Sequence, residues 1–215
     1  MFSDLLTQYV ATAHARQLAL ADLIGERDWQ LDLTAGQVTF GDDLSFPIQL
    51  LGTESHLDGT WLWAWANEQS GLPRQLLALS SWMREFGVRQ GVTELTDATF
   101  PLDRADGHRL ALVASGLTGR CYYRGPYDGG AVFFHLEGVP DQPVAPERAF
   151  TVVNQVLMGY PVEHRAMVTA FLSQQGWRVA SEDGLVTGVH PSGSEMRVEF
   201  DGQGRISNLT GQLRR

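Results

Sequence analysis

A run of alternating tryptophans is the feature that most limits how this chain can fold. Three of its six tryptophans stand at every second position in the segment TWLWAWAN, residues 60–67. In an extended strand, successive side chains point to opposite faces. Trp61, Trp63 and Trp65 are therefore predicted to share one face of a strand over residues 60–66. Three indoles on one face form either the centre of a core or the floor of a binding groove.

The residues between the tryptophans favour the core. Leu62, Ala64 and Ala66 are also apolar, and a strand that is apolar on both faces is typical of a central strand covered on both sides. In the alternative, at least one indole lines a pocket. A row of rings roughly 7 Å apart would then suit sugars, nucleobases or a proline-rich peptide.

Charge and composition restrict the partners and the cell compartment. The 215 residues carry 25 acids against 16 bases, a formal net charge of −9, whereas a nucleic-acid binder needs a cationic surface. No apolar run approaches the roughly 20 residues that span a bilayer, and the N-terminus lacks the pattern of a signal peptide. With a single cysteine, Cys121, the chain is predicted to be cytoplasmic, with neither a nucleic-acid nor a membrane partner.

The absence of lysine excludes several kinds of chemistry. All 16 basic residues are arginines. Schiff-base catalysis and the attachment of pyridoxal phosphate need a primary amine, and the P-loop and protein kinases use a lysine to contact phosphate. We expect no cofactor.

Hydrophobic periodicity predicts an α+β fold. The expected helices span residues 4–24, 72–87, 103–117, 147–159 and 162–175. The expected strands lie at 29–33, 38–40, 46–50, 60–66, 121–124 and 131–136, and three or four more form an antiparallel meander within 177–213. Tight turns join neighbouring strands, which indicates an antiparallel sheet with helices packed on it.

A proline-rich segment at residues 138–146 is the best candidate for a linker, because proline interrupts regular elements. It predicts an N-terminal α+β domain over residues 1–145. Residues 146–215 would form a smaller region of helices and a β-meander, either separate or packed with the first as one unit.

Three segments resemble an uncharacterised family of high-GC bacteria, a domain of unknown function. They are FPIQLLGTESHLDGTWLWAWAN (46–67), DGHRLALVASGL (106–117) and YYRGPYDGGAVFF (122–134). The resemblance covers roughly residues 1–160, and the tryptophan strand with its trailing asparagine is its most specific part. It implies a bacterial, cytoplasmic protein, and it implies no activity, cofactor or catalytic residue.

No catalytic or metal-binding signature stands out. The chain has no G-x-S-x-G elbow and no G-x-G-x-x-G fingerprint, and Cys121 is predicted to be a small buried hydrophobe. Residues 54–58 and 103–108 each combine histidine with carboxylates. Turn formation and a helix N-cap at Asp103 or Asp106 explain them without a metal. We expect neither catalytic residues nor a metal site.

The hairpin around residues 122–130 is the second candidate for binding. Arg124 could clamp an anionic group with its two-pronged guanidinium, beside Tyr127 and Asp128. The simpler interpretation is an ordinary turn with an Arg–Asp pair across it and tyrosines on the sheet surface.

Two functional hypotheses follow from these patterns. The favoured one is a non-catalytic binding or protein-interaction module with a protein partner or a second copy of itself. The alternative is a small-ligand-binding protein or hydrolase-like enzyme with a pocket between the tryptophan strand and the 122–128 hairpin. Trp63, Trp65 and Asn67 would form one wall of that pocket, and the hairpin would supply the polar contacts.

Overall fold

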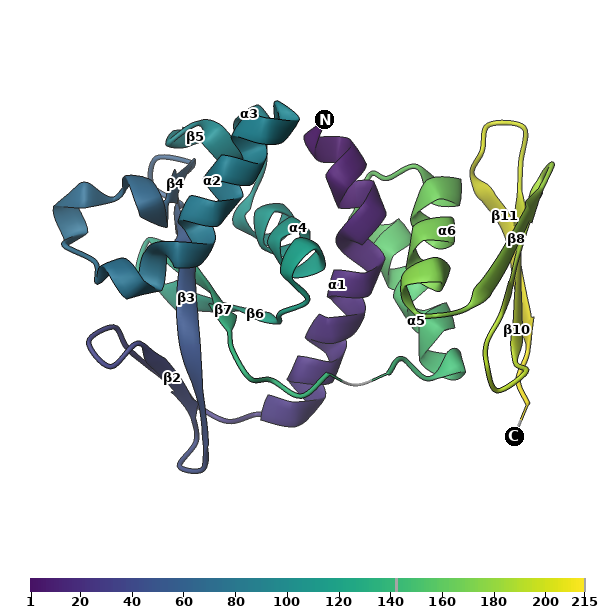
Figure 1. Cartoon of the computed structure of the whole chain (residues 1–215), viewed down its shortest axis with the longest axis horizontal. Coiled ribbons are helices and arrows are strands. Elements are labelled where there is room, and N and C mark those ends of the chain that lie inside the picture. Colours follow the sequence, from purple (N-terminus) through teal and green to yellow (C-terminus); the bar gives the residue numbers. More distant parts are fainter. Residues whose placement is uncertain (142, 215) are drawn as a thin grey trace. The chain divides into compact units, whose positions relative to one another are not determined.

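The computed structural model describes residues 1–141 and 143–214, shown in Figure 1. Its internal contacts divide the chain into two compact units. The N-terminal unit comprises Met1–Phe2 and Arg16–Pro140, and the C-terminal unit comprises Ser3–Ala15 and Asp141–Arg215. Helix α1 (Phe2–Ile24) therefore contributes residues to both. The division into independently folding domains at residue 145 stays a prediction.

The N-terminal unit is built on a seven-stranded sheet in which every pair of strands is antiparallel. The strands are β1 (Trp29–Asp32), β2 (Gln37–Phe40), β3 (Leu44–Ser55), β4 (Thr60–Trp63), β5 (Thr99–Pro101), β6 (Tyr122–Tyr127) and β7 (Gly130–Leu136). The helices after α1 are α2 (Ala78–Gln90), α3 (Thr93–Thr96) and α4 (Gly107–Thr118), with short 3₁₀ turns η1 (Ala64–Ala66), η2 (Glu68–Ser70) and η3 (Arg74–Leu77). The predicted α+β class is confirmed.

Strand β3 is the centre of the sheet. Its 12 residues pair with β2 at one end, with β4 at the other, and with β7 from Ile48 onwards. The register with β7 shifts between Leu50 and Gly52, a bulge that leaves Leu51 without a partner. The prediction that the tryptophan strand is central is therefore wrong, because β4 has four residues and lies between β3 and the short strand β5.

The tryptophan segment is only half a strand. Strand β4 ends at Trp63, and the chain turns into η1, where the N–H of Asn67 donates to the carbonyl of Ala64. Trp61 and Trp63 are fully buried, as the core interpretation expects. Trp65 leaves their common face and is half-buried, with the Arg84 guanidinium carbon 4.3 Å from its ring centroid. A shared face for all three indoles is thus wrong for the third.

The two buried indoles belong to the face of the sheet that α4 covers. The rings of Trp61 and Trp63 meet edge to face at 5.4 Å, and Trp61 contacts Phe133 of β7 at 5.7 Å. The indole N–H of Trp63 donates to the carbonyl of Glu94 at 3.0 Å. These contacts make the first two tryptophans packing elements.

Helix α4 begins directly above Phe133. The Asp106 carboxylate caps it by accepting from the N–H of Arg109 at 2.8 Å, so Asp106, and not Asp103, is the N-cap of the two that the sequence offered. Gly107 has no room for a side chain, because a Cβ there would collide with the Phe133 ring. The helix ends at Gly119, which adopts the left-handed conformation with φ of 73°.

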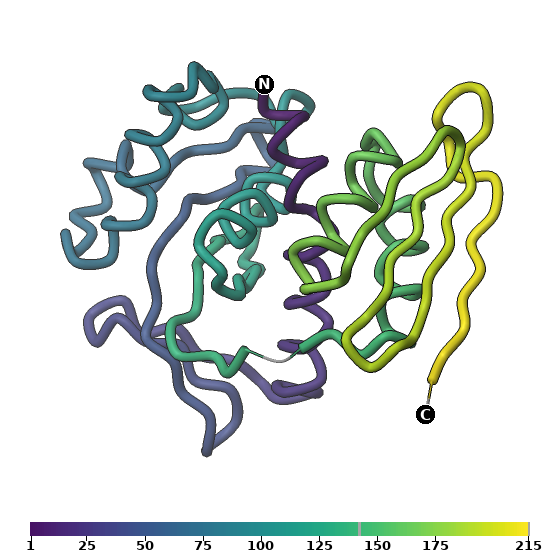
Figure 2. The backbone as a smooth tube through the Cα atoms, turned by 45° about the vertical axis from the view of Figure 1, so that its right-hand side comes forward, coloured from purple at the N-terminus to yellow at the C-terminus, as the bar shows by residue number. Residues whose placement is uncertain are grey.

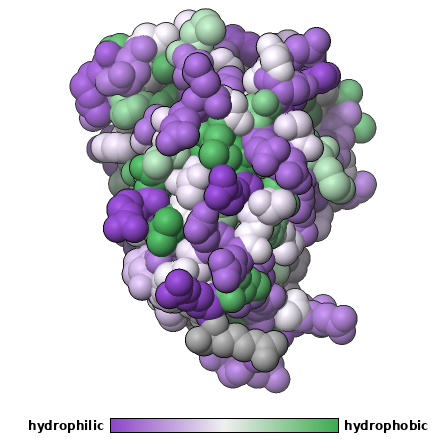
Figure 3. Space-filling model, turned by 90° about the vertical axis from the view of Figure 1, so that its right-hand side faces the viewer, coloured by the Kyte–Doolittle hydropathy of each residue, from purple (hydrophilic) through white to green (hydrophobic). Residues whose placement is uncertain are grey.

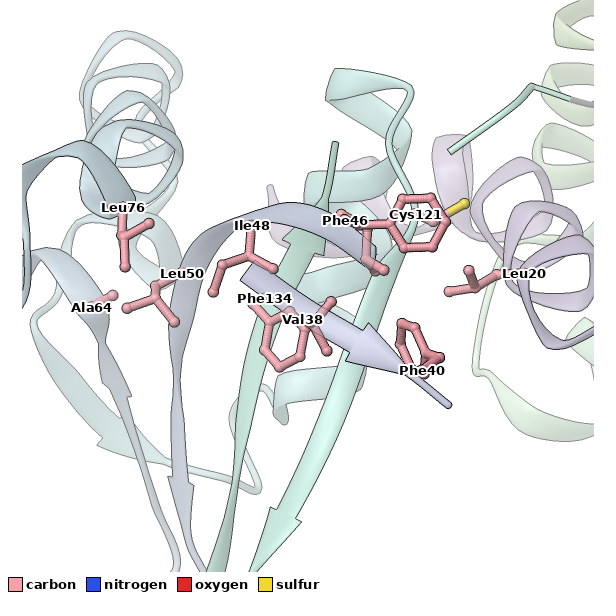
Figure 4. Packing of buried hydrophobic residues seen from close by; sticks show 11 residues of the cluster. Leu20, Val38, Phe40, Phe46, Ile48, Leu50, Ala64, Leu76, Cys121 and Phe134 are labelled. Carbon is pink, nitrogen blue, oxygen red and sulfur yellow. The ribbon is translucent and has the colours of Figure 1, made fainter. Parts of the chain in front are cut away.

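The opposite face of the sheet carries a second hydrophobic cluster, drawn in Figure 4. Side chains from β2, β3, β7 and α1 point towards one another there, and Cys121 lies among them as the predicted small buried hydrophobe. The cluster consists of Leu20, Val38, Phe40, Phe46, Ile48, Leu50, Ala64, Leu76, Cys121, Phe134 and Leu136.

The C-terminal unit is a two-layer arrangement of helices on a meander, which Figure 2 follows along the backbone. Its elements are α5 (Pro146–Gly159), α6 (His164–Gln174), β8 (Arg178–Glu182), β9 (Leu185–Val189), β10 (Glu195–Phe200) and β11 (Ile206–Gln212). The strand order β11-β10-β9-β8 confirms the predicted meander. At Gly188, a Cβ would lie 2.8 Å from Leu172, so α6 packs closely on β9.

Strand β10 shows why only one face of the meander is covered. Met196 and Val198 are buried, whereas Glu195, Arg197 and Glu199 alternate with them and face the other way. On the face drawn in Figure 3, hydrophobic residues are scattered among hydrophilic ones. In the described ranges, no helix combines the length and the apolar character needed to cross a bilayer.

A histidine lies in the core of the N-terminal unit. His135 of β7 is fully buried beneath α4, with its Nδ1 3.5 Å from the Thr118 hydroxyl and no well-aligned partner for Nε2 within the described chain. Burial lowers the pKa of His135 to about 3, and the positive charge of Arg120 contributes in the same direction. His135 is therefore uncharged in the folded protein at neutral pH.

Replacing Trp63 by alanine should cost roughly 3–5 kcal/mol of the free energy of unfolding, because it empties a fully buried indole site. Urea denaturation measures this loss. Trp65→Ala is the matched control and should cost less, since its side chain is only partly buried, whereas that of Trp63 is fully buried. Equal losses in the two variants would contradict the separate roles of the two indoles.

The buried His135 should make the protein acid-sensitive. Below pH 6.5 the unfolded chain binds a proton at this residue, whereas the folded chain binds it only near pH 3. The free energy of unfolding of the wild type, relative to that of His135→Leu, should therefore fall as the pH drops from 6.5 towards about 3. The fall is at most about 1.4 kcal/mol per pH unit. Urea denaturation of both proteins between pH 7.5 and 4.5 tests this, and a constant difference would refute it.

Candidate functional site

The N-terminal unit contains a hollow on the sheet face opposite the indoles, which we call the leucine pocket. Its volume is about 270 Å³. It is lined by Leu31, Leu33, Leu50, Gly52, Thr53, Leu62, Ala64, Asn67, Ser70, Leu72 and Val132.

The leucine pocket exists because the chain turns away after β4. Leu62 and Ala64 point to the face opposite Trp61 and Trp63, and η1 and η2 then lead the chain around the edge of the hollow to Gly71, which adopts φ of 55°. The side chains of Leu31, Leu62, Leu72 and Val132 are only half-buried. Apolar surface that a closed core would cover is thus left accessible.

Three polar residues line the leucine pocket: Thr53, Asn67 and Ser70. The Ser70 hydroxyl donates to Oδ1 of Asn67 at 2.9 Å, and Thr53 of β3 adds a second hydroxyl. A pocket that is mainly apolar with a few polar groups at fixed positions is the usual form of a small-molecule site.

A second group of functional side chains gathers where α4 begins, and we call it the Arg124 cluster: Glu54, His56, His108, Tyr122 and Arg124. Glu54 is 5% exposed, and its Oε1 accepts from the N–H of Gly107 at 2.6 Å. The positive end of the α4 dipole stabilises this buried carboxylate. Its other oxygen lies 3.6 Å from Nε2 of His56.

His108 links the members of the cluster on β6. Its Nδ1 lies 3.2 Å from the hydroxyl of Tyr122, and its ring stands perpendicular to Phe133 at 5.3 Å. Desolvation of the ring lowers the pKa of His108 below its usual value, while Asp106 and Glu54 oppose this and Arg124 adds to it. The imidazole of His108 is thus uncharged at neutral pH, and it lies within the electrostatic influence of the Arg124 guanidinium.

The residues of the predicted tryptophan wall lie in different environments in the structure. Trp63 is buried in the core, and Trp65 is half-buried under Arg84. Asn67 is the one residue of the predicted wall found among those lining the leucine pocket.

The predicted hairpin residues do not join that pocket. Arg124 belongs to the cluster at α4, Tyr127 is half-exposed with its hydroxyl 3.2 Å from the carbonyl of Glu54, and Asp128 is exposed in the turn. No ion pair between Arg124 and Asp128 occurs within the described ranges, so the simple pairing across the turn is not found. The hairpin instead reaches the pocket through Val132.

Of the residues in the two sites, the sequence indicates Asn67 and Arg124 as binding residues, but it does not indicate the apolar lining of the pocket or the role of Glu54 and His108. Leu62 and Ala64 were recognisable as the face opposite the indoles, but the alternation did not indicate that this face is hollow. For Glu54, the sequence pattern suggests only a metal ligand or a turn residue. Among the residues that the structure describes, no group of three or more histidine, cysteine or acidic side chains could hold a metal.

Comparison with known proteins gives a family and no function. Searches of curated proteins and of solved structures find no match. The model of a family of unknown function, DUF6882, matches residues 3–139, more than half of the chain. This agrees with the resemblance to an uncharacterised family, and the chain belongs to the DUF6882 family.

Proposed function

We propose that this protein is a non-catalytic binding protein that holds a small, mainly apolar molecule in the leucine pocket. The observation that carries the proposal is the set of half-buried apolar side chains around a hollow of about 270 Å³. When a ligand covers exposed apolar surface, the free energy of the system falls by about 25 cal/mol for each Å² removed from water.

The size and polarity of the leucine pocket define the ligand class. Its volume lies just below the usual range for ligand pockets, roughly 300–1,000 Å³. An indole or a short acyl chain is of suitable size. Thr53, Asn67 and Ser70 would bind polar groups of the ligand, and the leucines would enclose its apolar part.

The chemistry of the lining favours binding over catalysis. The residues around the leucine pocket include neither a titratable side chain nor a cysteine, so they supply no general acid, general base or strong nucleophile. The acidic composition and the single cysteine fit a bacterial cytoplasm.

A protein partner or a second copy of the chain is a second candidate. Helix α2 favours it, because Trp82 is 37% exposed and stacks on Phe86, and Val88 is 68% exposed. Sedimentation of the wild type and of Trp82→Ser tests this. Association that the substitution weakens would support it, and a monomer at every concentration would exclude self-association.

Two simple probes, indole and 1-octanol, should raise the melting temperature if the leucine pocket binds apolar ligands. Binding stabilises the folded state by about 2.7 kcal/mol at a hundredfold excess over the dissociation constant. Thermal unfolding followed by circular dichroism measures the shift.

Val132→Phe should abolish this stabilisation by placing a larger side chain on the wall of the pocket. Val88→Phe makes the same change at an exposed position of α2 and should respond like the wild type. The proposal fails if neither probe stabilises the wild type, or if Val132→Phe responds as strongly as Val88→Phe.

A further inference from the structure

Arg124 is a half-buried arginine without a polar partner. Neither a hydrogen bond nor an ion pair of its guanidinium is found among residues 1–141 and 143–214. Other half-buried arginines are paired: Arg16 donates to a carbonyl, Arg104 and Arg109 bind carboxylates, and Arg165 donates to a hydroxyl. This difference calls for a physical explanation.

An unpaired guanidinium is costly in a partly dehydrated position. It carries five N–H donors, and withdrawing a charge from water without a partner raises the free energy of the fold. The planar fork of arginine matches two oxygens of a carboxylate or a phosphate. A partner of that kind would satisfy Arg124.

The acidic groups that act on His108 together with Arg124 already have other partners. Glu54 accepts from the N–H of Gly107 and lies near His56, and Asp106 binds Arg109 at 2.8 Å. The negative charge of Glu54 is also offset by the start of α4. The cation on β6 thus has no carboxylate aimed at it.

His108 supplies a further donor on the same face of the sheet. Tyr122 and Arg124 stand two residues apart on β6, so both side chains point to the face covered by α4. If the Tyr122 hydroxyl donates to Nδ1 of His108, the imidazole carries its proton on Nε2 and presents it as a donor.

We propose that Arg124 and His108 form a binding site for an oxyanion, either a carboxylate or a phosphate group, with Tyr122 as a positioning residue. Arg124 would contact two oxygens, and Nε2 of His108 would donate to the same anion. The site lies on the sheet face opposite the leucine pocket. The proposal is therefore independent of the proposed function, and either can fail without the other.

NMR titration of the full-length protein tests the site directly. Inorganic phosphate and acetate are added separately at constant ionic strength, with chloride as the reference anion, and the histidine ring signals are followed. A saturable shift of His108 that chloride does not produce is expected. The bound anion should also raise the apparent pKa of His108, because it favours the protonated ring beside Arg124, Glu54 and Asp106.

The two anions distinguish the sources of the ligand. A response to phosphate alone assigns the site to phosphate groups, a response to acetate alone assigns it to carboxylates, and a response to both assigns it to either group. If neither anion produces a saturable shift at His108, the proposal is overturned.

Matched variants locate the anion at Arg124. Arg124→Gln should weaken phosphate or acetate binding at least tenfold, whereas Arg74→Gln, at an exposed position of η3, should leave it unchanged. Arg124→Lys keeps the charge without the fork, and several-fold weaker binding is expected. Tyr122→Phe should alter the nitrogen shifts of the His108 ring before any anion is added. Binding of wild-type strength by Arg124→Gln or Arg124→Lys would refute the assignment.

Discussion

The contact between Gly52 and the indole of Trp61 is the constraint on which the sheet depends. A Cβ at position 52 would collide with the Trp61 ring and with the carbonyl of Leu62. Only glycine leaves β4 this close to β3, directly after the bulge at Leu51. Trp61 can then lie against β3 and reach Phe133 on β7.

This contact also decides what the other face of the sheet becomes. Because the indoles of Trp61 and Trp63 fill the side under α4, the alternating residues Leu62 and Ala64 are presented on the opposite side. There the chain leaves the strand through η1 and does not cover them completely. The leucine pocket is thus a consequence of how the tryptophans pack.

Strand β3 positions the second site as well. Two residues beyond Gly52, the buried carboxylate of Glu54 holds the N-terminus of α4 through Gly107. This hydrogen bond sets the start of α4, and with it the place of His108 beside Tyr122 and near Arg124. One strand therefore connects the apolar hollow on one face with the polar cluster on the other.

Periodicity predicted most of the helices and strands because most of them have one covered face. The helix at residues 4–24 shows a helical period of apolar residues, the hairpins and the C-terminal meander show an alternation of apolar and polar residues, and each element is present. Two elements, α3 and β5, were missed because they span four and three residues, too few to show a period.

The sites were harder to predict than the elements. Alternation states which side chains share a face, but it does not show whether that face is filled or hollow, so the indoles were taken for a possible wall in place of Leu62 and Ala64. Spacing along the chain also cannot show that Asp128 leaves Arg124 unpaired. That fact depends on how α4 and the hairpin meet in space.

The stability of Gly52→Ala tests whether the contact between Gly52 and Trp61 organises the sheet. A methyl group at this position has to displace Trp61 or the backbone of β4, so we expect a loss of about 1–3 kcal/mol or more in urea denaturation. Gly202→Ala is the control, because a Cβ there meets nothing within 4 Å, and it should be as stable as the wild type or slightly more so. If Gly52→Ala were as stable as this control, the Gly52–Trp61 contact would not be what organises the sheet.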